Sequence, residues 1–276
     1  MEFFLAVMVF VLGMCIGSFI NMAVWRVANG KPILGRNKLR PYSRGLIYQT
    51  LNNRSYCDFC GKQLSWYDNI PVFSWLFYRG KSRCCGKKLP LLYPIVEIST
   101  GCLFLLNYSA RGGSAYGGQS SIFNLQSIVV YMILGLLVFE AAFDFKYMVI
   151  PDRSAYALIG LVAIRWLILG AKIEYLYTAL LSALFIFILH KIKIKGQQAM
   201  GDGDIFLAFF MGLFLGFPGI ILAFYLAFIV GAVVGIILIM KKKVKKLSPI
   251  PFGPFLILGT VVAFFWGEEI IKIIKF

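Results

Sequence analysis

The sequence predicts an all-α, polytopic integral membrane protein with about eight transmembrane helices and one cytoplasmic cysteine-rich loop. Three observations support this fold class. Hydrophobic residues make up 60% of the 276-residue chain and charged residues only 14%. Apolar runs long enough to cross a membrane recur along the chain, and basic residues concentrate in alternate loops. A soluble domain of average composition contains about 45 to 50% apolar residues, so this chain is too apolar to be one.

Seven apolar runs fall within the range of roughly 17 to 25 residues that a membrane-spanning helix needs. They occupy residues 3–25, 92–109, 125–143, 154–170, 173–190, 220–240 and 254–274. An eighth run, 205–216, gives only about 18 Å of helix against a hydrocarbon core of about 30 Å. Counted from Ala199 it reaches about 27 Å, so we expect the intervening Gly-Asp-Gly-Asp element to lie at or just inside the membrane surface.

The net charge of +16 comes from basic residues that lie in alternate loops, which indicates membrane topology and not a nucleic-acid site. Of 28 Lys and Arg residues, 13 lie in residues 26–90, two in 144–153, three in 191–204 and five in 241–253. By the positive-inside rule these loops face the cytoplasm, and an eight-span chain then has both termini outside. We therefore expect a membrane lipid environment and no nucleic-acid partner. In the first run, Gly13 and Gly17 lie one turn apart, with the polar residues Ser18 and Asn21 near its inner end. This pattern favours close helix packing, and a ligand-binding role is the alternative.

The loop 26–90 contains two cysteine pairs, Cys57-Asp-Phe-Cys60 followed by Gly and Cys84-Cys85 followed by Gly. They resemble two knuckles of a four-thiolate zinc site, with Cys57, Cys60, Cys84 and Cys85 as ligands. A loop of this size has little core of its own, so metal binding could supply folding free energy. The second pair lacks the two intervening residues of a normal knuckle. A three-cysteine site with another ligand, or no metal, are therefore the alternatives, and a disulfide is disfavoured in a reducing cytoplasm.

Acidic residues at a membrane boundary are costly and usually functional. Asp144 closes the run that begins at Leu125 and, on the topology above, emerges on the cytoplasmic side, as does Asp204. Two such carboxyl groups can share one proton, so that one acts as a base toward water while the other polarises a carbonyl, as in aspartic proteases. The structural alternative is that Asp204 merely caps the following helix, with Asp202-Gly203 in a turn.

Two further acids compete for a catalytic role. Asp202 lies within the same Gly-Asp-Gly-Asp element, and Glu140 lies one helical turn before Asp144 on the same face. Glu140 could tune the Asp pair, serve helix packing or face the cytoplasm.

These motifs together resemble the bacterial type IV prepilin peptidases, the leader peptidase/N-methyltransferase family of Gly-X-Gly-Asp intramembrane aspartyl proteases. The resemblance runs over nearly the whole chain and rests on Gly17-Ser-Phe-X-Asn21, the cysteine loop with Asp68-Asn-Ile-Pro71, Tyr93-Pro94 with Glu97, Asp144 followed by Ile150-Pro151-Asp152, and Gly201-Asp202-Gly203-Asp204 followed by Phe206-Leu207 and Gly212. It implies that Asp144 and Asp204 are the catalytic residues. The family's loop usually has two Cys-X-X-Cys pairs, whereas Ser82 stands where the third cysteine would be.

The resemblance also implies an enzyme of the bacterial plasma membrane with two activities. It would cleave the basic leader of prepilins or pseudopilins at the cytoplasmic face, typically after a Gly, and then methylate the new terminal amine with S-adenosylmethionine. No glycine-rich nucleotide loop in residues 26–90 indicates where that cofactor binds. On this basis the predicted domains are a first transmembrane helix (1–25), a zinc-binding loop domain associated with methylation (26–90) and a helical peptidase domain (91–276).

Two other function classes remain alternatives. A proton- or cation-coupled transporter could use Asp144, Asp204 and Glu140. It predicts internal repeats, which the two halves of the sequence do not show, and it leaves the cysteine loop unexplained. A zinc-anchored scaffold without catalysis leaves the paired Asp unexplained.

Overall fold

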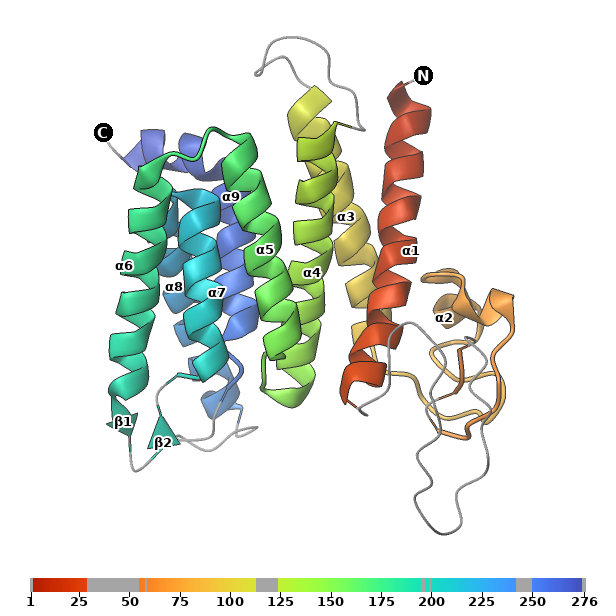
Figure 1. Cartoon of the computed structure of the whole chain (residues 1–276). Coiled ribbons are helices and arrows are strands. Elements are labelled where there is room, and N and C mark those ends of the chain that lie inside the picture. Colours follow the sequence, from red (N-terminus) through yellow and green to blue (C-terminus); the bar gives the residue numbers. More distant parts are fainter. Residues whose placement is uncertain are drawn as a thin grey trace, which may run out of the picture. The chain divides into compact units, whose positions relative to one another are not determined.

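The computed structural model describes residues 2–28, 55–57, 59–112, 124–194, 197–198, 200–241 and 250–274. These residues form nine α-helices, a short 3-10 helix (η1) and two strands of two residues each. In chain order the elements are α1 (Glu2–Ala28), η1 (Trp66–Asn69), α2 (Phe73–Phe77), α3 (Leu92–Gly112), α4 (Leu125–Tyr147), α5 (Asp152–Ile168), α6 (Ile173–Lys191), β1 (Lys193–Ile194), β2 (Gln197–Gln198), α7 (Asp202–Leu215), α8 (Gly219–Met240) and α9 (Gly253–Ile274) (Figure 1). The all-α prediction is confirmed for this part of the chain, apart from the small antiparallel β1–β2 pair.

A helix covers each of the eight predicted apolar runs. Among the described residues, four helices, α1, α4, α6 and α8, are long and apolar enough to cross a membrane. Helix α7 has 14 residues, and its length of about 21 Å is less than the hydrocarbon thickness, as the sequence predicts. The first part of the predicted loop domain, 29–54, and the basic stretch 242–249 lie outside the described residues.

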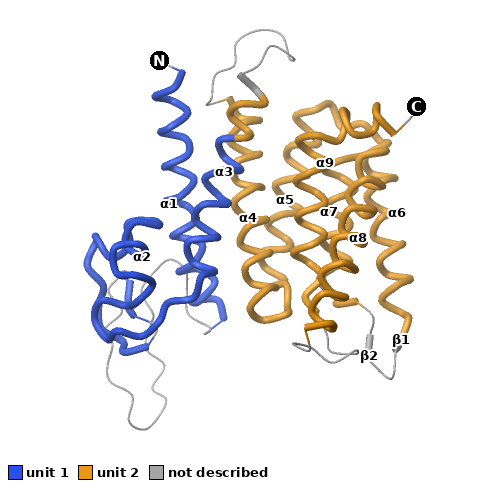
Figure 2. Tube along the Cα trace, turned by 180° about the vertical axis from the view of Figure 1, so that it is seen from behind, with its two compact units in different colours: residues 1–105 blue, residues 106–276 orange. Residues whose placement is uncertain are grey.

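The described chain divides into two compact units, Met1–Leu105 and Leu106–Phe276 (Figure 2). In the first unit, α1 and α3 pack antiparallel through small residues. A Cβ atom at Gly13 would lie 2.8 Å from the Cα atom of Gly101, and Gly17 makes an equally close approach one turn later. Further along, the side-chain amide of Asn21 donates to the backbone oxygen of Tyr93 at 3.1 Å. The glycine spacing of the first helix therefore serves helix packing, as predicted.

The second unit contains α4 to α9 around one hydrophobic core. Helix α7 contacts α5, α6, α8 and α9, and fully buried Phe210 and Met211 belong to it. The Ser182 hydroxyl of α6 donates to the backbone oxygen of Ala208 in α7 at 2.8 Å, so these two helices are also joined by a polar contact. The short α7 is thus held on several sides, and this fixes the position of its first turn.

Candidate active site and candidate metal site

Asp144 lies in the last turn of α4 and is 6% exposed. The helix ends three residues later, where Met148 adopts a left-handed conformation with φ of 56°. The carboxylate oxygen Oδ2 of Asp144 accepts a hydrogen bond from the backbone N–H of Gly253, the first residue of α9, at 2.9 Å. A Cβ atom at Gly253 would lie 2.7 Å from that same oxygen, so only glycine lets this amide reach the carboxylate.

Asp204 is the third residue of α7 and is 7% exposed. Gly201 is the N-cap residue, and its N–H donates to Asp204 Oδ2 at 3.1 Å, while the Asp204 N–H donates to the Gly201 oxygen at 3.2 Å. The alternative of Asp204 as N-cap after an Asp202-Gly203 turn is therefore wrong. The helix starts earlier, at Asp202, and Asp204 reaches back to the cap from the position that capping-box acids occupy.

The two motifs that carry these acids touch each other. A Cβ atom at Gly203 would lie 2.6 Å from Cβ of Ile150, so the segment that follows α4 packs directly on the first turn of α7. The structure thus brings together two buried acids that lie 60 positions apart in the sequence.

The structure separates the two rival acids. The Asp202 side chain is 83% exposed and lies in contact with His190 rather than in the buried site. Glu140 is fully buried, and neither of its carboxylate oxygens has a hydrogen-bond partner among the described residues. The nearby Ser154 hydroxyl donates to the backbone oxygen of Pro151 instead, at 2.8 Å. Glu140 is therefore the third acid of this buried region, whereas Asp202 lies at its surface.

His190, the single histidine of the chain, is a site residue that the sequence analysis did not single out. It lies at the end of α6 and is 6% exposed. Its Nδ1 atom is 2.8 Å from the backbone oxygen of Met200, and its Nε2 atom is 3.3 Å from Oδ1 of Asp202. The ring therefore contacts the residues on both sides of Gly201, whose N–H holds Asp204. The sequence did contain a signal for His190, because it lies at the cytoplasmic end of a predicted span, the same end at which Asp144 and Asp204 were predicted.

The cysteine loop forms two equivalent turns. The Gly61 N–H donates to the Cys57 oxygen at 2.9 Å, and the Gly86 N–H donates to the Ser82 oxygen at 2.8 Å. Both glycines have φ of 68°, a left-handed value that glycine adopts without steric cost. Ser82 therefore occupies in the second turn the position that Cys57 has in the first, and Cys85 matches Cys60.

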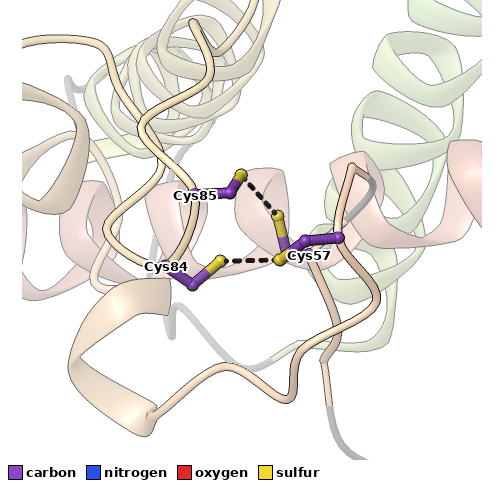
Figure 3. A group of neighbouring side chains, drawn as sticks. Cys57, Cys84 and Cys85 are labelled. Carbon is purple, nitrogen blue, oxygen red and sulfur yellow. Dashed lines mark hydrogen bonds between the residues drawn. The ribbon is translucent and has the colours of Figure 1, made fainter.

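The four predicted metal ligands lie together in space. The Sγ atoms of Cys57 and Cys85 are 3.8 Å apart, those of Cys60 and Cys84 are 3.1 Å apart, and all four lie within 4.8 Å of one another. Figure 3 shows the sulfur atoms of Cys57, Cys84 and Cys85 pointing toward one another. Tetrahedral zinc with bonds of about 2.3 Å requires sulfur atoms about 3.8 Å apart. The cluster could therefore hold a metal ion, with Cys84 supplying the thiol that Ser82 cannot.

In a comparison with known proteins, each half of the chain matches a protein-family model. Residues 11–110 match the model of the bacterial peptidase A24 N-terminal domain, and residues 128–236 match that of the type IV leader peptidase family. The prepilin leader peptidase/N-methyltransferase of Xanthomonas campestris pv. campestris is 30% identical over 94% of this chain and 91% of its own length. The proteins of the same name from Bacillus subtilis and Pseudomonas aeruginosa are each 28% identical, over 95% of this chain and 95% and 90% of their own lengths.

This chain belongs to the prepilin leader peptidase/N-methyltransferase family. No solved structure matches it significantly. Asp144 and Asp204 fall in the part matched to the type IV leader peptidases, and the four clustered cysteines fall in the N-terminal part. The buried acids and the thiol cluster therefore belong to separately matched regions of this family member.

The pKa values of two thiols of the cluster shift in opposite directions. A hydrogen bond from the Lys62 backbone lowers the pKa of Cys60, but the Cys84 thiol, burial and the Cys57 thiol outweigh it and raise that pKa to about 12. Burial raises the pKa of the Cys57 thiol, but hydrogen bonds from the Ser82 hydroxyl and from the backbone amides of Phe59 and Cys60 together outweigh it and lower the pKa to about 6. The thiolate is the form of cysteine that binds metals. The Ser82 hydroxyl lies 3.3 Å from Cys57 Sγ and 3.2 Å from Cys84 Sγ. In this family member Ser82 therefore contacts two thiols of the cluster through its hydroxyl, and the cluster keeps four possible thiol ligands.

Proposed function

We propose that this protein is an intramembrane aspartyl endopeptidase that removes the leader peptide of type IV prepilins or pseudopilins, with Asp144 and Asp204 as its catalytic residues. The observation that carries this proposal is the contact of Ile150 with Gly203, which joins the two acid-bearing helix ends in one buried site. Membership of the prepilin leader peptidase family supports prepilins as the substrates.

In the proposed mechanism the two carboxyl groups share one proton. Two like charges at close range resist double ionisation, so one group stays protonated while the other is charged. The charged group takes a proton from water, and the protonated group donates to the scissile carbonyl oxygen. Backbone N–H groups of Gly253 and Gly201 hold one oxygen of Asp144 and Asp204, respectively. Both carboxyl groups are thereby oriented before substrate arrives, which reduces the entropic cost of the reaction.

The proposal includes an eight-span topology in the bacterial plasma membrane. Helices α1 and α3 to α9 would cross or enter the bilayer, with both termini outside and cleavage at the cytoplasmic face. The lengths and apolarity of α1, α4, α6 and α8 support this topology, and so does the placement of basic residues in alternate loops. The short α7 would start at the cytoplasmic interface, where a Gly at the cleavage site would let the substrate backbone approach both acids.

The cysteine cluster would hold one structural zinc ion. Cys57, Cys60, Cys84 and Cys85 have the number, type and spacing of ligands that such a site requires. The ion would stabilise a loop whose two turns have little apolar core between them. The name of the relatives supports a second activity, methylation of the new amino terminus, for which S-adenosylmethionine would supply the methyl group.

The test uses the full-length protein in liposomes with a purified prepilin. Asp144→Asn and Asp204→Asn should each abolish cleavage, because an amide cannot take the proton from water, while the circular dichroism spectrum stays that of the wild type. Asp202→Asn is the matched control in the same motif, and it should retain activity because its side chain points to solvent. Cleavage by folded Asp204→Asn protein at near the wild-type rate would show that the dyad assignment is wrong.

A further inference from the structure

Between the first cysteine turn and the second lies a segment with an unusually apolar surface, residues 66–77, which we call the aromatic segment. It comprises η1, the connecting residues and α2. Four of its large side chains are strongly exposed: Trp66 by 79%, Phe73 by 67%, Leu76 by 59% and Phe77 by 80%. Soluble surfaces rarely expose so many large apolar side chains close together, and such surfaces mark contacts with proteins or membranes.

The contacts of the aromatic segment with α1 indicate its depth. The Ser18 hydroxyl of α1 donates to the backbone oxygen of Asn69 at 3.4 Å. The uncharged run of α1 ends at Trp25, and Arg26 follows it. Ser18 precedes Trp25 by seven residues, which is about 10 Å of helix. If α1 crosses the bilayer with Trp25 at its boundary, Asn69 lies roughly this far inside the membrane surface.

Helix α3 makes a second contact with the aromatic segment, at the same level of α1. The backbone N–H of Val72 donates to Oε2 of Glu97 at 2.7 Å. Glu97 in turn faces Gly17 of α1, because a Cβ atom at Gly17 would lie 2.6 Å from the Glu97 Cα atom. Figures 1 and 2 both show α2 alongside α1 rather than beyond its C-terminal end. Two helices therefore hold the aromatic segment at the level of their apolar parts.

The polar groups of the aromatic segment are compatible with a lipid environment. Asp68 is its one charged residue, and both carboxylate oxygens accept from the Arg83 guanidinium, at 2.9 and 3.0 Å. Local hydrogen bonds satisfy backbone N–H groups, which lipid cannot do. They include Phe73 N–H to the Pro71 oxygen at 2.6 Å, Ser74 to Ile70 at 3.2 Å and Leu76 to Val72 at 3.0 Å.

We propose that the aromatic segment inserts into the cytoplasmic leaflet, with the lipid acyl chains and glycerol region as its partner. Trp side chains such as Trp66 are enriched where a bilayer meets water, and Phe side chains such as Phe73 and Phe77 suit the acyl region below it. Exposed Arg79 and Lys81 follow directly and suit the anionic lipid head groups above it. The insertion holds the cysteine turns at the membrane surface. It depends on α1 crossing the membrane and not on the proposed peptidase activity.

Acyl-chain photolabelling tests this in the wild-type chain. The full-length protein is reconstituted in phosphatidylethanolamine and phosphatidylglycerol liposomes that contain a phospholipid with a diazirine in its acyl chain. After illumination, trypsin cleavage at Lys62 and Arg79 isolates residues 63–79, and cleavage at Arg54 and Lys62 isolates residues 55–62 as a control from the same loop. The control also contains aromatic residues, Tyr56 and Phe59, but belongs to the first cysteine turn.

We expect lipid adducts on peptide 63–79, within residues 66–77, and no lipid adducts on peptide 55–62. Equal labelling of the two peptides would overturn the proposal. Absence of lipid adducts from peptide 63–79 would overturn it as well, because the acyl chains would then not contact the aromatic segment.

Fluorescence provides a second measurement. Lipids brominated near the carbonyl end of the acyl chain should quench part of the tryptophan emission, and that part should be lost in Trp66→Phe protein. If the emission lost in this variant is instead quenched by aqueous iodide and not by the brominated lipid, Trp66 faces water and the proposal fails.

Discussion

Gly253→Ala tests whether the backbone N–H of α9 orients Asp144. The added Cβ atom would meet Asp144 Oδ2 at 2.7 Å and Cγ at 3.2 Å, against an existing N–H to Oδ2 bond of 2.9 Å. Either the carboxylate rotates away or α9 shifts, and the hydrogen bond is weakened in both cases. A hydrogen bond to a charged group contributes about 1.5 to 3 kcal/mol, and that loss in the transition state lowers the rate about 10- to 160-fold.

The assay measures kcat and KM for prepilin cleavage by wild-type and Gly253→Ala protein in liposomes. We expect kcat to fall by that factor while KM changes little, because the catalytic carboxylate is displaced but the substrate surface is not. Gly160→Ala is the matched control. This glycine also lies in a helix of the second unit, and nothing lies within 4 Å of a Cβ atom built there, so activity should be unchanged. Full activity of Gly253→Ala would refute the positioning role of this amide.

Three further outcomes are expected. Protein purified without chelator should contain about one zinc per chain, and Cys60→Ser should lower the zinc content and loop stability without stopping proteolysis; elemental analysis showing no zinc in the wild type would contradict this. His190→Ala should lower kcat because it removes the contact to the Met200 oxygen beside the cap of α7, and His190→Asn should recover part of the loss because its amide can still donate to that oxygen. Equal activity of His190→Ala and wild type would exclude this role. In the substrate, replacement of the Gly before the cleavage site by Val should block cleavage, whereas removal of one leader Lys should weaken membrane-surface binding by only about 1 kcal/mol; normal processing of the Val substrate would show that close backbone approach is not required.

The positions of the helices could be predicted from the sequence because each apolar run must bury its backbone hydrogen bonds within itself in a membrane. The shortness of α7 was equally visible, since it depends only on the number of apolar residues between Asp204 and Gly216. Asp144 and Asp204 were found because charged residues next to such runs are rare. Their juxtaposition was predicted from topology, and their catalytic role stays a prediction.

Only the tertiary structure decided how these acids are held. Asp144 is oriented by an amide 109 residues further along the chain, and no periodicity or local propensity links such distant positions. The sequence allowed Asp204 to be an N-cap, and the contact between Gly203 and Ile150 together with the Gly201 hydrogen bond decided that the helix starts at Asp202 instead. The contacts of His190 depend in the same way on the packing of α6 beside α7.

In the cysteine loop, too, the sequence predicted one part of the site and the tertiary structure decided the other. Its sequence contained the four thiols and the two glycines, and this sufficed to predict two turns. It did not decide whether adjacent Cys84 and Cys85 can both face one centre, because the direction of a side chain in a turn depends on the backbone of the whole loop. Once that backbone repeats the first turn with Ser82 in place of Cys57, Cys84 lies 3.1 Å from Cys60 and completes the cluster.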